Sequence, residues 1–428
     1  MKILYISYFY PPLGGPAALR NLKTVKYFSE AGAEITVLTV EDIEYAYNDP
    51  SLVTGCGERH LVHVPSWDPM ALLRKAFGKN RAASQMVYKR SPERLKLMIR
   101  QMAPIDDKIG WLPHLLRTGR KLLQKQDYEL IYVSCGPFSS AIGAYKLAEE
   151  FHLRLVVDYR DYWTLLSDYD LMGNAFKRKL SRAWEQRILK RADFVVCATC
   201  GIRDDLAAAF DPDLIKRSFV LYNGHDERDF DGLAAGRPSS SHYSLCYFGN
   251  IYARRSLKHL YQAILELERE ELVPQNLRIL LSGNFNREVY DEIEHSGISE
   301  RIQVMPQLSH KEALRTMQEA DALILVINSS SPKGTLTSKV FEYLRLARPI
   351  LAMVPQNGEA AQLLQECGIT TLCPMESVSG IKECLNRLFD APVAELQPAS
   401  ALAKYERGAQ LRVLYQHLQD LVTTTQKV

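Results

Sequence analysis

The sequence predicts an α/β protein made of two doubly wound domains that face each other across a cleft. Short, continuously apolar segments alternate with helical segments from residue 3 to about residue 198. The alternation stops near residue 224, where Asn223-Gly224 indicates a turn, and resumes at residue 244. Apolar strands separated by helices are typical of a parallel sheet covered on both faces. Such sheets bind ligands outside the carboxyl ends of their strands, so two of them predict one deep cleft.

Each domain contributes five clear strands. The first domain is expected to have strands at residues 3–7, 35–39, 130–133, 155–157 and 194–198, and the second at 245–248, 278–281, 302–304, 322–327 and 349–353. We therefore place the first domain at 1–223 and the second at 224–400. Residues 401–428 form a C-terminal helical segment, and the sequence does not decide which domain it packs against.

Composition excludes several classes of protein. The chain has 428 residues, 46% hydrophobic and 24% charged, with a net charge of +3, which is too small to indicate a nucleic-acid-binding protein. It contains no apolar run of ~20 residues that would span a membrane, and its opening run is too short for a signal peptide. We expect a cytoplasmic protein with reduced thiols. A lone C-x-x-C at 197–200 lacks the second pair of a zinc ribbon, although a redox dithiol remains an alternative.

Residues 67–125 depart from the strand–helix order. Arg and Lys outnumber Asp and Glu by roughly three to one there, interleaved with apolar residues. One interpretation is a solvated helical insertion. The other is a basic amphipathic surface that meets anionic lipid headgroups or a phosphate-bearing acceptor.

Two segments of the first domain are candidates for ligand contact. Gly14 and Gly15 connect the first strand to a helix that begins at Pro16, where backbone N–H groups can approach an anion. The spacing is not G-x-G-x-x-G, so no nicotinamide cofactor is indicated, and a tight turn is the alternative. At the end of the strand 155–157, the charged residues expected to face the cleft are Asp158, Arg160 and Asp161, with aromatic residues among them. A structural Arg160–Asp161 pair is the alternative.

In the second domain, Gly249 and Asn250 end a strand and are followed by cations at 254, 255 and 258, a pattern that suits a diphosphate. Exposure to solvent is the alternative for these cations.

Residues 328–349 are the most informative stretch. A polar loop leads to a helix that Thr337 or Ser338 is expected to cap. Lys339 and Glu342 are three residues apart and so share one face of this helix. A helix N-terminus with hydroxyls and a lysine binds phosphate, and the carboxylate can accept hydrogen bonds from ribose hydroxyls. A capped helix with a Lys–Glu surface pair, worth about 0.3–0.5 kcal/mol, is the alternative.

Taken together, these segments resemble family 4 of the retaining glycosyltransferases with the GT-B fold, which has two Rossmann-like domains and includes many bacterial polysaccharide enzymes. The resemblance covers nearly the whole chain. The matching residues and segments are 9–12, Gly14, Gly15, Arg20, 134–137, 158–163, 223–224, Gly249, Arg255, Gly283, 320–321 and, most specifically, 338–349.

The resemblance implies transfer of a sugar from a nucleotide-diphosphate donor to a glycan or polyprenyl-linked acceptor, with retention at the anomeric carbon and no metal or other cofactor. Arg255 and Lys339 would neutralise the leaving diphosphate, and Asp161 would complete the catalytic set. The implied donor site also contains Gly249, Asn250, Gly283, Gly334, Thr335, Ser338 and Glu342. Arg160 and Trp163 are implied on the acceptor or sugar side.

The chain departs from the family pattern at three points. Many relatives have two glutamates eight positions apart, and the first falls on Gly334 here. Arg160-Asp161 stands roughly where many relatives have a histidine, and Asn250 stands where they often have an arginine.

The D-x-D motifs at 168–170 and 211–213 do not directly follow a predicted strand, so we interpret both as solvated turns rather than metal ligands. Two other functions share the architecture: a nucleotide-sugar epimerase, and a non-catalytic sugar-nucleotide-binding subunit. We expect the enzyme in the cytoplasm, in possible contact with the anionic inner face of the cytoplasmic membrane.

Overall fold

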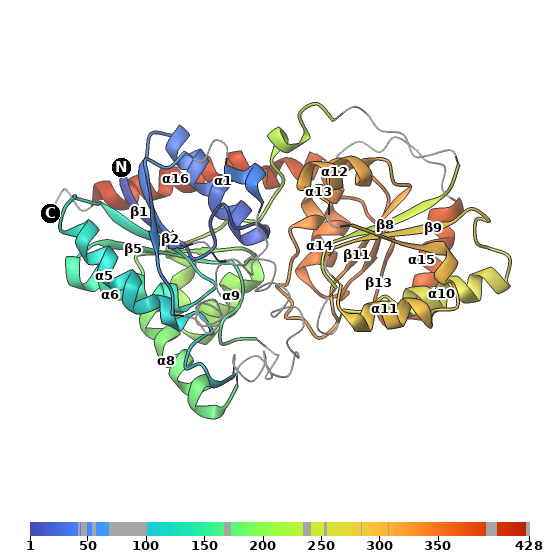
Figure 1. The fold of residues 1–428 in the computed structure, drawn as a ribbon, viewed down its shortest axis with the longest axis horizontal. Helices are drawn as coiled ribbons and strands as arrows, with labels where there is room; N and C mark the ends of the chain where they lie inside the picture. The colour runs from blue at the N-terminus through green and yellow to red at the C-terminus, as the bar shows by residue number, and fades with distance from the viewer. Residues whose placement is uncertain are drawn as a thin grey trace, which may run out of the picture. The chain divides into compact units, whose positions relative to one another are not determined.

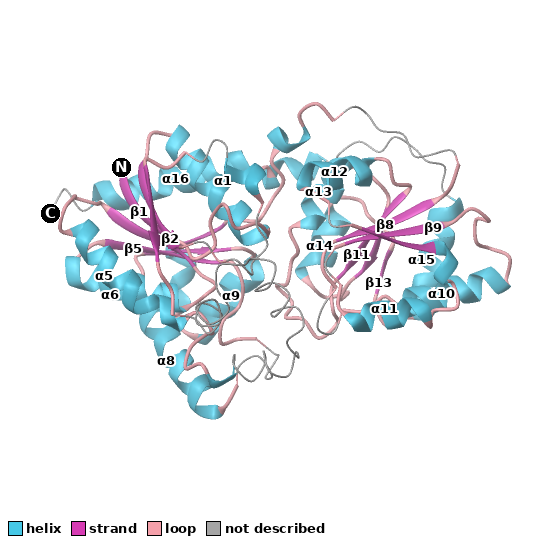
Figure 2. Cartoon of the chain, viewed as in Figure 1, coloured by secondary structure: helices cyan, strands magenta, loops and turns pink. Residues whose placement is uncertain are grey.

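The computed structural model describes residues 1–41, 43, 49–53, 57–67, 101–166, 173–233, 241–251, 255–283, 285–306, 308–390 and 400–424. The chain forms two compact units, one comprising residues 1–222 and 408–428 and the other residues 223–407. Each unit is a parallel sheet with helices on both faces, as Figures 1 and 2 show. The predicted fold of two doubly wound α/β domains is therefore confirmed.

The first unit is built on a sheet of seven parallel strands in the order β3-β2-β1-β4-β5-β6-β7. The central strand β1 pairs with β2 and β4, so that Tyr5 lies opposite both Val37 and Tyr132. The strands are β1 (Lys2–Ile6), β2 (Glu34–Val40), β3 (His60–Val64), β4 (Leu130–Ser134), β5 (Arg154–Tyr159), β6 (Phe194–Cys197) and β7 (Ser218–Val220).

Both faces of this sheet are buried, because alternate side chains of each strand enter different apolar clusters. Leu4 and Ile6 belong to one cluster, whereas Ile3 and Tyr5 belong to the other. The second cluster also contains residues of α1 and α16, so these two helices cover that face. The helices of the unit are α1 (Pro16–Glu30), α5 (Leu112–Leu123), α6 (Ser139–Phe151), α8 (Ala175–Arg191), α9 (Cys200–Ala209) and α16 (Arg407–Thr423).

The packing of α16 answers a question that the sequence left open. Its apolar residues Leu411, Leu414 and Leu418 are buried in the cluster that contains Tyr5 and Phe28. The polypeptide therefore returns from the second unit to cover a face of the first.

The second unit has six parallel strands in the order β10-β9-β8-β11-β12-β13. Its strands are β8 (Ser244–Phe248), β9 (Arg278–Ser282), β10 (Ile302–Met305), β11 (Ala322–Val326), β12 (Ile350–Met353) and β13 (Leu372–Cys373). Helices α10, α11 and α15 lie on one face and α12, α13 and α14 on the other (Figure 1). Their bounds are α10 (Lys258–Arg269), α11 (Arg287–Glu294), α12 (His310–Gln318), α13 (Lys339–Leu346), α14 (Glu359–Glu366) and α15 (Val378–Asp390).

Three edge strands, β3, β7 and β13, are absent from the sequence prediction. Strand β3 is exposed along most of its length and contains two histidines, so it lacks the continuous apolar character of a central strand. Strands β7 and β13 have only three and two residues, which is too short for a recognisable pattern.

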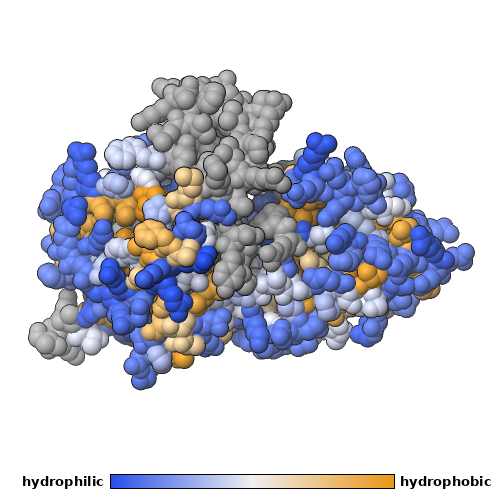
Figure 3. All heavy atoms as spheres, turned by 90° about the horizontal axis from the view of Figure 1, so that it is seen from below, coloured by the Kyte–Doolittle hydropathy of each residue, from blue (hydrophilic) through white to orange (hydrophobic). Residues whose placement is uncertain are grey.

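In the described part of the chain, no helix is long and apolar enough to cross a membrane. The face of the molecule shown in Figure 3 is mostly hydrophilic where it is described, with apolar side chains gathered in separate patches.

Candidate functional site

The end of β8 brings a glycine, a tyrosine and a lysine together in the second unit. The amino group of Lys339 lies 4.4 Å from the centroid of the Tyr247 ring. Gly249 has a φ of 128°, and a Cβ atom there would lie only 2.0 Å from Lys339 Nζ. A side chain at position 249 would be strained by this backbone conformation and would have to displace the end of the Lys339 side chain. The lysine packs directly against the backbone that follows β8.

A second glycine allows the ends of β8 and β9 to approach each other. A Cβ atom on Gly283 would lie 2.3 Å from the carbonyl oxygen of Gly249. The backbone N–H of Gly249 donates to the carbonyl of Ser282 at 2.7 Å, which fixes this arrangement. The neighbouring Asn250 has an exposed side chain, and its carbonyl accepts a hydrogen bond from the Tyr247 hydroxyl at 3.1 Å.

The helix α13 begins at Lys339 without a side-chain cap. Ser338 makes no capping hydrogen bond, and the buried hydroxyl of Thr337 has no hydrogen-bond partner. Instead, the first turn closes with bonds from Val340 N–H to the Thr337 carbonyl and from Phe341 N–H to the Ser338 carbonyl, both 3.3 Å. The expectation that Thr337 or Ser338 caps this helix is therefore wrong. The helix N-terminus keeps its affinity for an anion because no side chain of these residues neutralises it.

Lys339 and Glu342 do not form a surface ion pair with each other, which was the alternative to a ligand site. Glu342 Oε1 lies 2.8 Å from Nε2 of His310, at the start of α12, and the structure shows no ion pair for Lys339 with any described carboxylate. The pKa of Lys339 is lowered to about 7. Burial is the largest cause, the neighbouring charge of Arg255 adds to it, and the charge of Glu342 partly opposes both. Two cations, Arg255 and Lys339, are thus brought together beside an uncapped helix N-terminus.

The loop before α13 supplies backbone rather than carboxylate groups. Gly334 is buried, and the N–H of Thr335 donates to the carbonyl of Pro332 at 2.9 Å in a turn. The site predicted on Gly334, Thr335, Ser338, Lys339 and Glu342 therefore lies on one continuous loop and helix.

In the first unit, the carboxyl end of β5 contains a buried ion pair. The guanidinium of Arg20 donates to both oxygens of Asp158, at 2.8 and 3.1 Å, and to the carbonyl of Leu221 at 2.8 Å. Both side chains are almost fully buried, with 4% and 0% exposure. The expectation that Asp158 faces a ligand is therefore wrong, because its carboxylate links β5 to α1.

The residues after Asp158 have different surroundings. Arg160 donates to the carbonyls of Cys135 and Gly136, at 2.7 and 2.6 Å, rather than forming a pair with Asp161. Asp161 is exposed, yet desolvation by nearby protein raises its pKa, and the charge of Arg160 opposes this. Trp163 is buried and stacks on Phe138 with ring centroids 4.7 Å apart. Within this group, Asp161 is the side chain that presents a charge to solvent.

The glycine loop adjoins this region. Gly15 is the N-cap of α1, Pro16 is its first residue, and no side chain caps the helix. The amide of Asn21 donates to Ser7 Oγ at 2.6 Å and to the carbonyl of Phe9 at 2.8 Å, which fixes the loop that leads to Gly14 and Gly15.

The two D-x-D motifs differ in what the structure shows. Asp168 and Asp170 lie outside the described residues. Asp211 caps a short 3₁₀ helix and pairs with Arg217, while Asp213 is exposed and pairs with Lys216. Across the described ranges, no group of three or more His, Cys, Asp or Glu side chains is arranged to hold a metal ion.

Sequence reasoning missed two side chains of the second-unit site, Tyr247 and His310. Tyr247 lies in the predicted strand 245–248, two residues before Gly249, and an aromatic ring at a strand end is a recognisable platform for a cation. His310 follows Ser309, which forms a capping box with Glu312 and so fixes the start of α12. That S-x-x-E signal predicts the helix start, but not the contact with Glu342.

Comparisons with known proteins agree with this architecture. Residues 17–220 match the family described as the glycosyl transferase 4-like domain. Sucrose-phosphate synthase from Thermosynechococcus elongatus is 13% identical, with a TM-score of 0.68 and 99% of both chains covered. HepE from Anabaena, solved with UDP and glucose, is 14% identical, with a TM-score of 0.65 over 98% of this chain and 100% of that one.

The lipopolysaccharide outer core galactosyltransferase WaaB, in its apo form, is 12% identical, with a TM-score of 0.59 over 99% of this chain and 100% of that one. No curated protein matches the sequence. Residues 17–220 are similar to a glycosyl transferase 4-like domain, and the whole chain has the two-domain fold of the GT-B glycosyltransferases.

Proposed function

We propose that this protein transfers a sugar from a nucleotide-diphosphate donor to a glycan or polyprenyl-linked acceptor, with retention at the anomeric carbon and without a metal ion. The bond between the anomeric carbon and the diphosphate breaks, the acceptor oxygen bonds to the same carbon, and the acceptor proton passes to the departing diphosphate. Negative charge grows on the leaving diphosphate during this step. Fixed positive charges aimed at that oxygen are the main means by which a protein lowers such a barrier.

The observation that carries this proposal is the position of Lys339. Its amino group lies over Tyr247 and against Gly249, near Arg255, and has no carboxylate partner among the described residues. The charge of Arg255 lowers the pKa of Lys339, and two neighbouring cations favour an anion as their common partner. A diphosphate at the N-terminus of α13 would supply that anion and would also accept from the uncapped N–H groups.

Glu342 has a different role in this proposal. One of its oxygens is bound by His310, and the structure shows no hydrogen bond from a described residue to the other. A free carboxylate oxygen one helical turn from a phosphate site suits the hydroxyls of a ribose. HepE is described in complex with UDP-glucose, which makes uridine diphosphate our first choice of probe.

The remaining predicted residues keep the roles that we propose from the resemblance. Asp161 is an exposed charged residue at the carboxyl end of β5, and we assign it to the sugar or the acceptor. Arg160 and Trp163 position the loop that bears Asp161, because their side chains contact Cys135, Gly136 and Phe138. Gly14 and Gly15 offer backbone N–H groups near that loop.

The test of the proposed function is calorimetric titration with UDP, ADP and GDP and their glucose and galactose conjugates, in the presence of EDTA. We expect one of these nucleotides to bind without a metal ion, and the corresponding sugar nucleotide to be consumed when an acceptor is present. NMR of the product reports whether the anomeric configuration is retained. Failure of all three nucleotides to bind would contradict the proposal, and binding that requires Mg²⁺ would contradict its metal-independent form.

Donor binding is expected to take up a proton at alkaline pH. With a pKa of about 7, the Lys339 amine is mostly neutral at pH 8, whereas a bound diphosphate requires its charged form. Binding therefore takes up close to ~1 proton at pH 8 and almost none at pH 6, where the amine is already charged.

Titrating UDP into the protein at each pH in two phosphate-free buffers whose ionisation enthalpies differ measures this uptake. In the Lys339→Arg variant the uptake should disappear, because arginine remains charged at both pH values. Equal proton uptake by that variant and the wild-type protein would assign the proton to another group.

The first unit also has a basic surface that fits the proposed contact with an anionic membrane. Most of the basic region at 67–125 lies outside the described residues, but α5 and α8 both pack against α6. Their exposed cations make no ion pair with a described carboxylate: Arg117, Lys121 and Lys125 in and just after α5, and Lys179, Arg182, Arg187 and Lys190 on α8. The ring of Phe176 is 71% exposed beside them.

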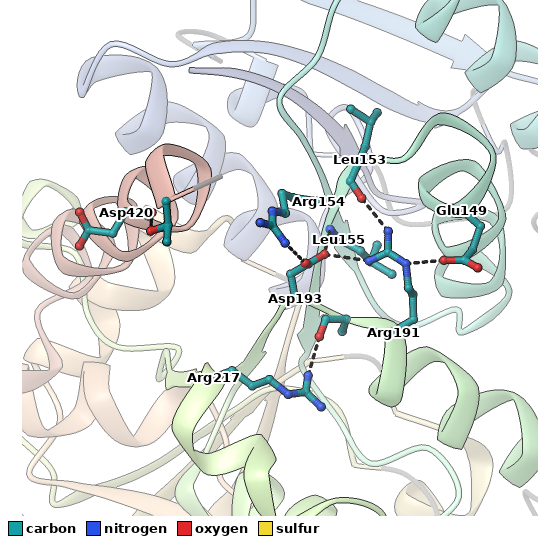
Figure 4. Close-up of polar contacts among 10 residues, drawn as sticks. Glu149, Leu153, Arg154, Leu155, Arg191, Asp193, Arg217 and Asp420 are labelled. Carbon is teal, nitrogen blue, oxygen red and sulfur yellow. Dashed lines mark hydrogen bonds and ion pairs between the residues drawn. The ribbon is translucent and has the colours of Figure 1, made fainter. Parts of the chain in front are cut away.

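Other arginines of this unit do not contribute to that surface. Figure 4 shows Arg154 and Arg191 donating to Asp193, at 2.5 and 2.8 Å, and Arg191 also pairing with Glu149. Arg217 donates to the carbonyl of Ala192 at 2.5 Å. These arginines connect strands and helices of the fold, and their charges are already balanced.

We expect the protein to sediment with vesicles that contain anionic lipid at low salt, and to be released at high salt. The variant Lys179→Glu/Arg187→Glu should bind such vesicles much more weakly, whereas Arg154→Gln, which removes one of the paired arginines, should bind like the wild type. Absence of binding to anionic vesicles at low salt would reject the membrane contact.

A further inference from the structure

We propose that His310 is the positioning residue of the ribose site, holding Glu342 so that its second oxygen faces the nucleotide. This inference rests on the proposed donor site and adds a residue to it that neither the sequence pattern nor the family match assigns. The contact joins α12 to α13 through two residues that are 32 positions apart in the chain.

The geometry gives His310 a fixed place from which to act. It is the first residue of α12, and the capping box of Ser309 and Glu312 closes the helix end around it. Its Nε2 lies 2.8 Å from Glu342 Oε1, and the two side chains are 32% and 18% exposed. A half-buried glutamate without this contact would sample several rotamers, since its side chain has three rotatable bonds.

The charges around His310 favour donation to Glu342. Burial lowers its pKa, but the hydrogen bond and charge of Glu342 raise it above the ordinary value, with help from Asp229 and against the charge of Arg407. An imidazole with a proton on Nε2 donates to the carboxylate, whichever charge state it has. The contact also satisfies Glu342 without Lys339, which leaves the lysine available to the diphosphate.

If His310 positions Glu342, its removal should affect the binding of a nucleotide with ribose hydroxyls more than the binding of one without them, which a purely structural role would not predict. The affected atom, Glu342 Oε2, is proposed to meet the ribose hydroxyls. His310→Ala should therefore weaken the binding of UDP by about tenfold, the usual effect of one charge-assisted hydrogen bond. The same variant should bind 2′,3′-dideoxy-UDP, which lacks those hydroxyls, within about twofold of the wild type.

Two further variants separate positioning from packing. His310→Gln keeps an N–H near the position of Nε2 and should restore most of the affinity for UDP. Arg345→Gln removes the ion pair between Arg345 of α13 and Glu227, and should leave the preference for UDP over its dideoxy form unchanged. Thermal melting of each variant reports any loss of stability separately.

The experiment is calorimetric titration of wild-type, His310→Ala, His310→Gln and Arg345→Gln proteins with UDP and 2′,3′-dideoxy-UDP. A selective loss for UDP in His310→Ala, recovered in His310→Gln, supports the inference. Equal losses for both nucleotides, or no loss for either, overturn it while leaving the donor site intact. If the wild-type protein binds none of UDP, ADP and GDP, the proposed function fails, and this inference fails with it.

Discussion

The Lys339→Ala variant is expected to fold normally and to lose about 100-fold in turnover at saturating donor, equivalent to about 3 kcal/mol of transition-state stabilisation. The lysine contributes no ion pair to the described structure, so its removal costs only its contacts with Tyr247 and the backbone at Gly249. Its charge acts on the diphosphate as negative charge grows there, and this is the contribution that the variant loses.

The measurement is steady-state transfer with the donor identified by titration, compared with thermal melting of the same protein. Lys382→Ala is the matched control, because Lys382 lies on α15, on the other face of the same sheet, and pairs with Glu270. Turnover of Lys339→Ala within twofold of the wild-type value would contradict the diphosphate assignment.

The Asp158→Asn variant is expected to destabilise the first unit by about 3–5 kcal/mol, because it removes the carboxylate charge that balances the buried charge of Arg20. The neutral amide has nearly the same shape, so little of this loss comes from packing. Replacing both partners, in Arg20→Met/Asp158→Leu, should cost less than the single change, since no charge then remains buried.

Urea unfolding followed by tryptophan fluorescence measures the loss of stability of the first unit. All four tryptophans of the sequence, at positions 67, 111, 163 and 184, lie in the first unit. Asp213→Asn, which breaks an exposed pair with Lys216, serves as the control and should unfold at the wild-type urea concentration. An unchanged midpoint for Asp158→Asn would show that the buried pair does not stabilise the unit.

The sequence predicted the sheets well because their central strands are continuously apolar. It also predicted that Lys339 and Glu342 share a helix face, since residues three apart on a helix always do. The spacing of residues along the chain does not predict which distant residue each side chain forms a hydrogen bond with. Glu342 bonds to His310 from another helix, and Asp158 bonds to Arg20, which lies 138 positions earlier.

Local chemistry misled the prediction in one case. Thr337 and Ser338 have the side chains that commonly cap helices, yet the first turn of α13 closes through its own backbone. A residue that caps a helix has extended backbone angles, whereas Ser338 has helical ones, with a φ of −59° and a ψ of −28°. The same hydroxyls are thereby left for a ligand.

The return of α16 to the first unit has a consequence for biosynthesis. Leu411, Leu414, Tyr415 and Leu418 complete an apolar cluster whose other members, such as Ile3 and Phe28, leave the ribosome hundreds of residues earlier. Until the ribosome has made residues 408–424, the part of this face that α16 covers stays exposed while the whole second unit is translated. Apolar surface exposed for that time is a site at which the nascent chain can aggregate.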